Sequence, residues 1–176
     1  MSINVFLSEE LPENKDKVIS IISFDKKVGY LNKILSIGTP ILNKKKLYEI
    51  WEVDDCVKSK NVNGVNISIS KNYIFGYTVF EKSGSYEELK SKISSEYENF
   101  FNLVKENKMQ IVKIWHYLPQ LLKKHSNGKT NYSLLCEARE NIYKQYYNDI
   151  EFPAATAIGI EGNKILIYFL ASLCKT

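Results

Sequence analysis

Residues 86–104 predict a long helix with a single apolar face. Ser85 and Glu88 form the pattern of a capping box, so this helix is expected to begin near Tyr86. Its apolar positions recur every three or four residues, at Leu89, Ile93, Tyr97, Phe100, Phe101 and Val104. That spacing places all of them on one stripe. A helix with such a stripe must bury it against another layer of structure, here predicted to be a sheet.

Short β-branched or alternating segments on both sides of this helix predict strands. They cover residues 18–24, 47–53, 65–69, 73–80, 111–118, 154–160 and 165–171. A second helix is expected over residues 131–147, after a loop at residues 120–130. The turn signals Asn63-Gly64 and Lys71-Asn72 predict that the second, third and fourth of these strands form an antiparallel meander. The whole order predicts an α+β fold with two helices packed on one face of a mixed sheet.

The length of 176 residues, 44% of them hydrophobic, predicts one soluble domain over residues 1–176 with a full core and no need of disulfides or metals. The longest apolar stretch, Ile165–Leu170, is far too short for a membrane helix. The first residues, 1–14, are acidic and lack the basic start and apolar centre of a secretory signal. No membrane association is therefore expected.

The cysteines are odd in number and widely spaced, at Cys56, Cys136 and Cys174. This usage is typical of a reducing compartment and predicts a cytoplasmic protein. Two histidines and three cysteines without ligand spacing predict no metal site. The chain also lacks a glycine-rich phosphate loop and a Gly-x-Ser-x-Gly elbow, so no cofactor is expected.

The cations of this chain are almost all lysine. The formal net charge is only +4, and 23 of the 24 basic residues are lysines, which is more typical of a solvated surface than of a nucleic-acid site. Arg139 is the single arginine. A guanidinium can hold a carboxylate or phosphate by two parallel hydrogen bonds, which an ammonium cannot do. The alternative for Arg139 is a structural ion pair with Glu137, Glu140 or another acid.

Three segments in the second half of the chain resemble the chorismatase family. They are Lys113–Pro119, Tyr132–Arg139 and Pro153–Gly159, and the likeness extends over roughly residues 18–172. Members of this family convert chorismate to a dihydroxycyclohexadiene acid or to hydroxybenzoates, with release of pyruvate. In the first segment Lys113 stands where the family pattern has Arg, and His116 where it has Asn.

The resemblance implies a Rid-like fold in which residues 1–176 correspond to the N-terminal half of a chorismatase. It implies a homotrimer with pockets between subunits, and a chorismate lyase that forms a hydroxybenzoate, here expected to be 4-hydroxybenzoate, for a biosynthetic pathway. One alternative is a non-catalytic module, derived from a chorismatase half, that binds an aromatic acid or acts as a scaffold. A weaker one is a Rid-type enamine or imine deaminase, which Ala155 disfavours because those enzymes carry Arg in the matching segment.

The resemblance also assigns residues to the substrate. Arg139 and Tyr132 match the helix positions expected to reach it, and Lys113, Tyr117 and Trp115 are added as an anchor, a hydrogen-bond donor and a stacking surface. The catalytic candidates are Glu137 and His116, since His116 titrates near neutral pH. Glu49, Glu52 and Glu137 are the acids nearest to the motif residues, and their spacing alone does not select one of them. Each of these side chains also has a structural alternative, such as packing in the core for Trp115 and His116.

Overall fold

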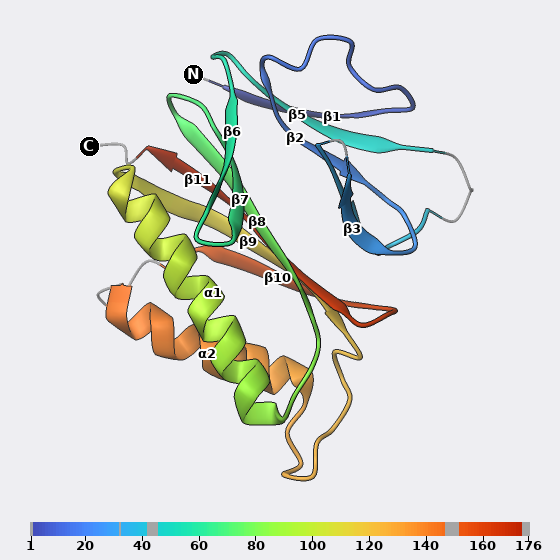
Figure 1. The fold of residues 1–176 in the computed structure, drawn as a ribbon, viewed down its shortest axis with the longest axis vertical. Helices are drawn as coiled ribbons and strands as arrows, with labels where there is room; N and C mark the ends of the chain where they lie inside the picture. Colours follow the sequence, from blue (N-terminus) through green and yellow to red (C-terminus); the bar gives the residue numbers. More distant parts are fainter. Residues whose placement is uncertain (1, 32, 42–45, 147–151, 174–176) are drawn as a thin grey trace.

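A computed structural model describes residues 2–31, 33–41, 46–146 and 152–173 (Figure 1). The elements found in these ranges are β1 (Ile3–Ser8), β2 (Val18–Ser23), β3 (Val28–Leu31), β4 (Ile34–Ile37), β5 (Tyr48–Val53), β6 (Lys58–Val62), β7 (Val65–Ile69), β8 (Tyr73–Glu81), α1 (Tyr86–Glu106), β9 (Met109–Pro119), α2 (Asn131–Tyr146), β10 (Ala154–Ile160) and β11 (Lys164–Leu173). The part of the predicted second helix at Tyr147, like Cys174, lies outside the described residues.

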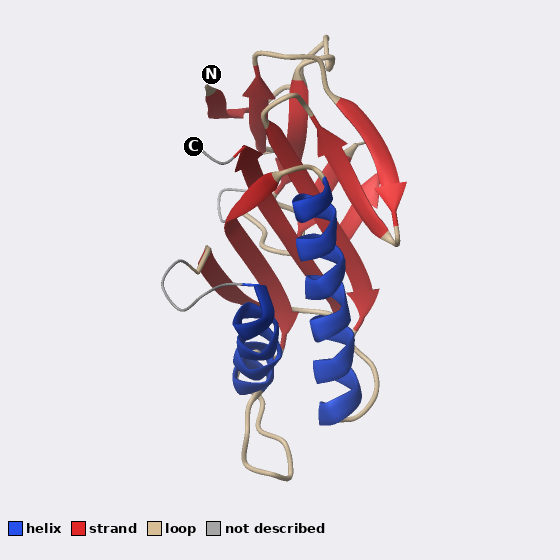
Figure 2. Ribbon diagram, turned by 90° about the vertical axis from the view of Figure 1, so that its left-hand side faces the viewer, coloured by secondary structure: helices blue, strands red, loops and turns tan. Residues whose placement is uncertain are grey.

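The central layer is a six-stranded mixed sheet in the order β10-β9-β11-β8-β7-β6. Strands β9 and β10 are parallel, and every other pair in this sheet is antiparallel. Both helices cover one face of it, as Figure 2 shows. The core between them contains Ile93 and Phe100 of α1, Leu134 of α2, and Ile114 and Phe169 of the sheet. The prediction of an α+β fold with two helices on one face of a mixed sheet is confirmed.

A second sheet, which the sequence did not predict, covers the opposite face. Its five strands lie in the order β1-β5-β2-β4-β3, so the protein has three layers, sheet on sheet on helices. Side chains from both sheets form one core, for example Trp51 and Val53 of β5 with Phe75 of β8 and Tyr168 of β11. The placement of residues 47–53 in a meander with β7 and β8 was therefore wrong: β5 pairs with β1 and β2.

The meander was misassigned because β6 was not recognised. This strand, Lys-Ser-Lys-Asn-Val, is polar and largely exposed, so it has no hydrophobic alternation. The Asn63-Gly64 turn joins β6 to β7, with positive φ angles of 50° and 85° that suit the tight hairpin turn predicted there. The predicted hairpin is therefore present, but its first strand is β6 and not residues 47–53.

The first helix begins as its sequence predicts. Ser85 accepts a hydrogen bond from the Glu88 backbone N–H, and the Glu88 carboxylate accepts one from the Ser85 backbone N–H, which completes the capping box. Tyr97 and Phe100 of the predicted stripe are fully buried. No helix in the described ranges is long and apolar enough to cross a membrane.

Gly76 allows the two central strands to pack around a phenylalanine ring. Gly76 of β8 lies opposite Phe169 of β11, which is fully buried, and a Cβ at position 76 would collide with that ring. We expect Gly76→Ala to lower the free energy of unfolding by about 2 kcal/mol, because a rigid ring in a packed core cannot move aside. Urea unfolding at pH 7.5 measures the effect. Gly29→Ala is the control, since a Cβ there meets nothing within 4 Å; equal losses in both variants would refute the explanation.

Candidate functional site

Strand β9 presents its predicted site residues on two opposite faces of the six-stranded sheet. Trp115 and Tyr117 pack against the five-stranded sheet, where the Trp115 ring lies 5.6 Å from that of Trp51. His116 points the other way and contacts Tyr97 of α1. The alternation of a strand makes this division unavoidable. Lys113, whose ammonium lies 4.8 Å from the Trp115 ring centroid, shares the Trp115 side.

Arg139 lies on the helix side, at the wall of an open cavity of about 520 Å³. This volume is within the usual range of small-molecule sites. The cavity is formed between α2 and the start of β10, and its lining residues are Cys136, Arg139, Glu140, Tyr143, Lys144, Phe152, Pro153 and Ala155. We call it the Arg139 cavity. None of Lys113, Trp115 and Tyr117 lines it, so the structure does not bring the five predicted substrate-binding residues together.

The Arg139 guanidinium is held over an aromatic ring and is left without an acidic partner in the described part of the chain. Its Cζ atom lies 5.8 Å from the centroid of the Tyr143 ring, one helical turn further along α2. No hydrogen bond or ion pair joins it to Glu137 or Glu140, the two acids named as possible structural partners; they pair with Lys129 and Lys144 instead. The Tyr143 ring in turn stacks on Phe152 at 5.1 Å. Arg139 and two stacked rings thus line the same cavity.

Tyr132 is on the same face of α2 as Arg139 but two turns earlier, about 10 Å along the axis. Its side chain is 46% exposed and does not line the Arg139 cavity. Cys136 lies between the two positions and does line it. Tyr132 therefore extends the face that carries Arg139 without forming part of the cavity wall.

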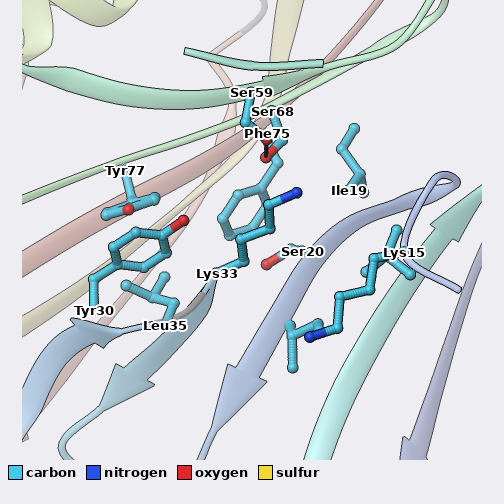
Figure 3. A pocket seen from close by; sticks show the side chains of 12 residues that line it. Lys15, Ile19, Ser20, Tyr30, Lys33, Leu35, Ser59, Ser68, Phe75 and Tyr77 are labelled. Carbon is cyan, nitrogen blue, oxygen red and sulfur yellow. Dashed lines mark hydrogen bonds between the residues drawn. The ribbon is translucent and has the colours of Figure 1, made fainter. Parts of the chain in front are cut away.

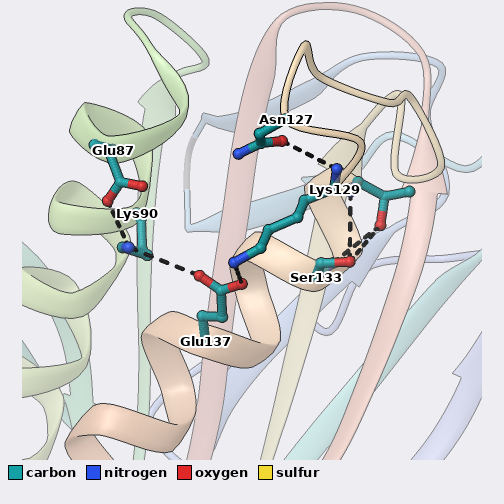
Figure 4. Close-up of polar contacts among 7 residues, drawn as sticks. Glu87, Lys90, Asn127, Lys129, Ser133 and Glu137 are labelled. Atoms are coloured by element: carbon teal, nitrogen blue, oxygen red, sulfur yellow. Dashed lines mark hydrogen bonds and ion pairs between the residues drawn. The ribbon is translucent and has the colours of Figure 1, made fainter.

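Glu137 faces the loop before α2 and the first turns of α1 (Figure 4). The Lys129 ammonium donates a hydrogen bond of 2.6 Å to its carboxylate, and Lys90 of α1 lies 3.7 Å away. The hydrogen bond from Lys129 lowers the pKa of Glu137, so the carboxylate stays ionised. This network joins three segments of the chain, and it gives Glu137 a structural role beside its predicted catalytic one.

His116 is fully buried in a hydrogen-bonded chain that connects α1, β9 and β10. Its Nδ1 donates to the Thr156 carbonyl oxygen at 2.7 Å, which leaves Nε2 to accept from the Tyr97 hydroxyl at 2.5 Å. Burial lowers the pKa of His116 to about 4, the Thr156 carbonyl opposes that shift, and the positive charge of Arg139 adds to it. His116 is thus a neutral ring at pH 7 and does not line the Arg139 cavity.

The inter-sheet side has its own polar group, Glu49 of β5. The Trp51 indole N–H donates to its carboxylate at 2.6 Å. Burial raises the pKa of Tyr117 and of Tyr168, and the charge of Glu49 raises both further. Since Trp115 and Tyr117 both stack on Tyr168, these residues form a packed aromatic layer between the sheets.

Tyr143 and Phe152 were not predicted as site residues. Tyr143 stands four positions after Arg139, so helical spacing alone places it beside the guanidinium. Phe152 reaches the cavity only because β10 returns next to α2, which no local pattern shows. Within the described ranges, no group of His, Cys, Asp and Glu is arranged to hold a metal ion.

Comparison with known proteins shows similarity to chorismatases. The family model described as chorismatase FkbO/Hyg5-like, N-terminal, matches residues 49–171. A chorismatase of Streptomyces hygroscopicus is 25% identical over 139 residues, which is 78% of this chain and 40% of that protein. A 3-hydroxybenzoate synthase of the same organism is 25% identical over 125 residues, covering 70% of this chain and 36% of its own length.

A crystal structure of a chorismatase has the same fold, with a TM-score of 0.84 at 21% identity, over 99% of this chain and 55% of that one. The chain thus spans about 40% of the length of the curated relatives it matches. The predicted family resemblance and the predicted fold are both confirmed.

Proposed function

Because this chain belongs to the family of FkbO/Hyg5-like chorismatase N-terminal domains, we propose that it binds chorismate in the Arg139 cavity and converts it to a hydroxybenzoate. The observation that carries this proposal is the position of Arg139. The single guanidinium of the chain lines a cavity of about 520 Å³ and has no acidic partner among the described residues. Chorismate is a ring with two carboxylates, and a free guanidinium is the group best suited to hold one of them by two parallel hydrogen bonds.

The walls of the Arg139 cavity suit the rest of such a molecule. Phe152 is 53% exposed and stacks on the buried Tyr143, so its ring offers an apolar surface against which a flat or half-flat ring packs. Lys144 adds a second positive charge, although Glu140 pairs with it at 2.6 Å. Ala155, which takes the place of the arginine of the Rid deaminases, lines this cavity too, so the guanidinium comes from the helix and not from the strand.

The proposed reaction splits chorismate into hydroxybenzoate and pyruvate without water or a redox partner. The bond between the ring and the enolpyruvyl oxygen breaks, the ring loses a proton and becomes aromatic, and the enolpyruvyl group gains one proton to become pyruvate. Aromatisation makes this step strongly downhill, so holding the substrate in its reactive conformation contributes much of the rate. Stabilisation of developing negative charge by Arg139 contributes the rest.

The proposal includes a neighbouring subunit. We propose that residues 1–176 form one domain, and that this domain assembles into a homotrimer in the cytoplasm. In the trimer a second copy closes the open side of the Arg139 cavity. Exposed Ala154 and Ala155 of the edge strand β10 lie next to that opening. An exposed edge with small side chains permits close approach of another chain, which can then supply the missing wall and a proton donor.

The second candidate is a module that binds an aromatic acid without converting it. Glu140 is the only carboxyl group among the described residues of the cavity wall, and it is paired with Lys144. The two predicted catalytic residues, Glu137 and His116, both lie outside that wall. A lone chain therefore has means to hold an anion but few means to move protons.

One assay separates these two functions. The purified protein is incubated with chorismate, and pyruvate, 3-hydroxybenzoate and 4-hydroxybenzoate are quantified by chromatography, with light scattering to give the oligomeric state. We expect pyruvate and hydroxybenzoate in equal amounts, with 4-hydroxybenzoate as the product, and a trimer in solution. Saturable binding of chorismate or hydroxybenzoate without turnover would support the binding module instead. Neither turnover nor binding would refute both.

A further inference from the structure

A small cleft opens between the two sheets (Figure 3). It lies on the face of the six-stranded sheet that the five-stranded sheet covers, whereas the Arg139 cavity lies on the helix face. Its volume is about 30 Å³, and it shares no lining residue with the Arg139 cavity. Lys15 and Ser20 approach it from the segment around the start of β2, and Lys33 approaches it from the turn between β3 and β4. Ser68 and Tyr77 belong to the other sheet. We call it the inter-sheet cleft.

The charged residues that line the inter-sheet cleft are all positive. The ammonium groups of Lys15 and Lys33 are its two charged groups, and no aspartate or glutamate lines it. Hydroxyl groups supply the remaining polar surface, including Ser59 and Ser68, whose oxygens lie 3.2 Å apart on neighbouring strands. A space between two packed layers that collects positive charge and hydroxyl donors is suited to a small anion.

Tyr77 provides a second and independent indication of a ligand. Its side chain is only 6% exposed, and its hydroxyl has no hydrogen-bond partner in the described part of the chain. The ring lies 4.8 Å from that of Tyr30. Burial, and secondarily the Tyr30 hydroxyl, raises the pKa of Tyr77, so the group remains a proton donor at any physiological pH. A buried donor without an acceptor is costly for a protein, and a bound acceptor relieves that cost.

We infer that the inter-sheet cleft binds the carboxylate group of a small molecule, held by Lys15, Lys33 and the Tyr77 hydroxyl. The cleft has room for two or three non-hydrogen atoms by comparison with the space that one buried water needs. That fits a carboxylate better than a tetrahedral phosphate. Apolar side chains, among them Phe75 and Leu35, form part of the lining, so the cleft suits a carboxylate with no more than a small alkyl group, such as acetate.

Such a ligand would connect the two sheets. Lys15 and Lys33 belong to the N-terminal part of the chain that forms the five-stranded sheet, whereas Tyr77 belongs to β8 of the six-stranded sheet. A carboxylate bound to all three adds a polar link across a boundary that is otherwise held by apolar packing. Because only the folded protein assembles these groups, the ligand must raise the thermal stability of the protein.

The test is thermal unfolding of the Arg139→Ala variant, so that anions bound at Arg139 do not contribute. Sodium acetate, phosphate and chloride are compared at equal ionic strength and pH 7.5. We expect acetate to raise the Tm in a saturable way, on the order of 5 °C at a hundredfold excess over its Kd. Tyr77→Phe should abolish this response and raise the Tm of the ligand-free protein by roughly 2–4 °C, because it removes an unpaired buried hydroxyl.

Lysine variants provide the matched controls. Lys33→Gln or Lys15→Gln should weaken the acetate response about tenfold, whereas Lys58→Gln, an equal change of charge at an exposed residue that does not line the cleft, should leave it intact. The inference is overturned if chloride or phosphate stabilises as well as acetate does, or if acetate has no effect. It is also overturned if the acetate response persists in both Tyr77→Phe and Lys15→Gln. A failure here leaves the Arg139 proposal unaffected, because chorismate turnover is measured separately on the unaltered protein.

Discussion

Arg139→Ala is expected to weaken chorismate binding about 100-fold while leaving the fold intact. The guanidinium is only half-buried and makes no ion pair with a described residue, so its removal leaves no unpaired charge behind. What is lost is a pair of charge-assisted hydrogen bonds to a carboxylate. At a half-exposed site each is worth about 1.5 kcal/mol, the low end of the usual range, so the pair amounts to about 3 kcal/mol, on the order of 100-fold. The KM for chorismate in the turnover assay measures the effect, and titration calorimetry gives the Kd if the protein binds chorismate without converting it. Circular dichroism confirms the fold.

Arg139→Lys tests whether geometry or charge matters. The ammonium keeps the charge but lacks the planar fork, so we expect binding to weaken about tenfold, between the original protein and the alanine variant. Lys105→Ala removes an exposed cation at the end of α1 and should change nothing. Equal KM or Kd values for Arg139→Ala and the original protein would remove the basis for placing the substrate in this cavity.

The helices and most of the strands follow from local sequence. The stripe of α1 and its capping box, the alternation of β9, and the bounds of β10 all depend on residues within a few positions of each other. The structure places β10 at Ala154–Ile160, as its sequence predicted, and α1 at Tyr86–Glu106. These local patterns predict the elements well because the face of a helix or strand that is already apolar is the face that becomes buried.

The second sheet could not be predicted in the same way. Strands β3 and β4 have only four residues each, and β1 exposes most of its side chains, so none of them shows a clear period. The pairing of β5 with β1 joins residues 40 to 50 positions apart, from Ser8 with Tyr48 to Ile3 with Val53. Which strands pair over such distances depends on which layers pack together. Local sequence patterns do not show that packing, so they do not predict the pairing.

The candidate site shows the same limit. The alternation of Lys113, Trp115 and Tyr117 already placed these three on one face of their strand and His116 on the other. It did not show that the Arg139 helix covers the His116 side. Residues that are close together in the motif therefore lie on opposite faces of the sheet. The single predicted pocket had combined Lys113, Trp115 and Tyr117 of one face with the Arg139 helix of the other.

Acidification from pH 7 to pH 5 is expected to destabilise the protein by about 2 kcal/mol through His116 alone. Burial lowers the pKa of this histidine from 6.5 to about 4. Between those two values the unfolded chain binds a proton that the folded protein cannot, so stability falls as the pH decreases through this window. Above pH 6.5 both states are neutral at this site and the effect disappears. Complete loss, below pH 4, amounts to about 3 kcal/mol.

His116→Gln and His116→Asn test this assignment. Glutamine reaches toward Tyr97 and asparagine toward Thr156, so each retains one of the two hydrogen bonds of the ring but cannot take up a proton. Both variants should be less stable than the original protein at pH 7.5, by about 1–2 kcal/mol. They should also lack the extra decline between pH 7 and pH 5 in urea unfolding. His125→Gln, which removes the other histidine, should retain that decline. If the decline is unchanged in both His116 variants, the acid sensitivity comes from the carboxylates, and the neutral His116 that links Tyr97 to Thr156 has no part in it.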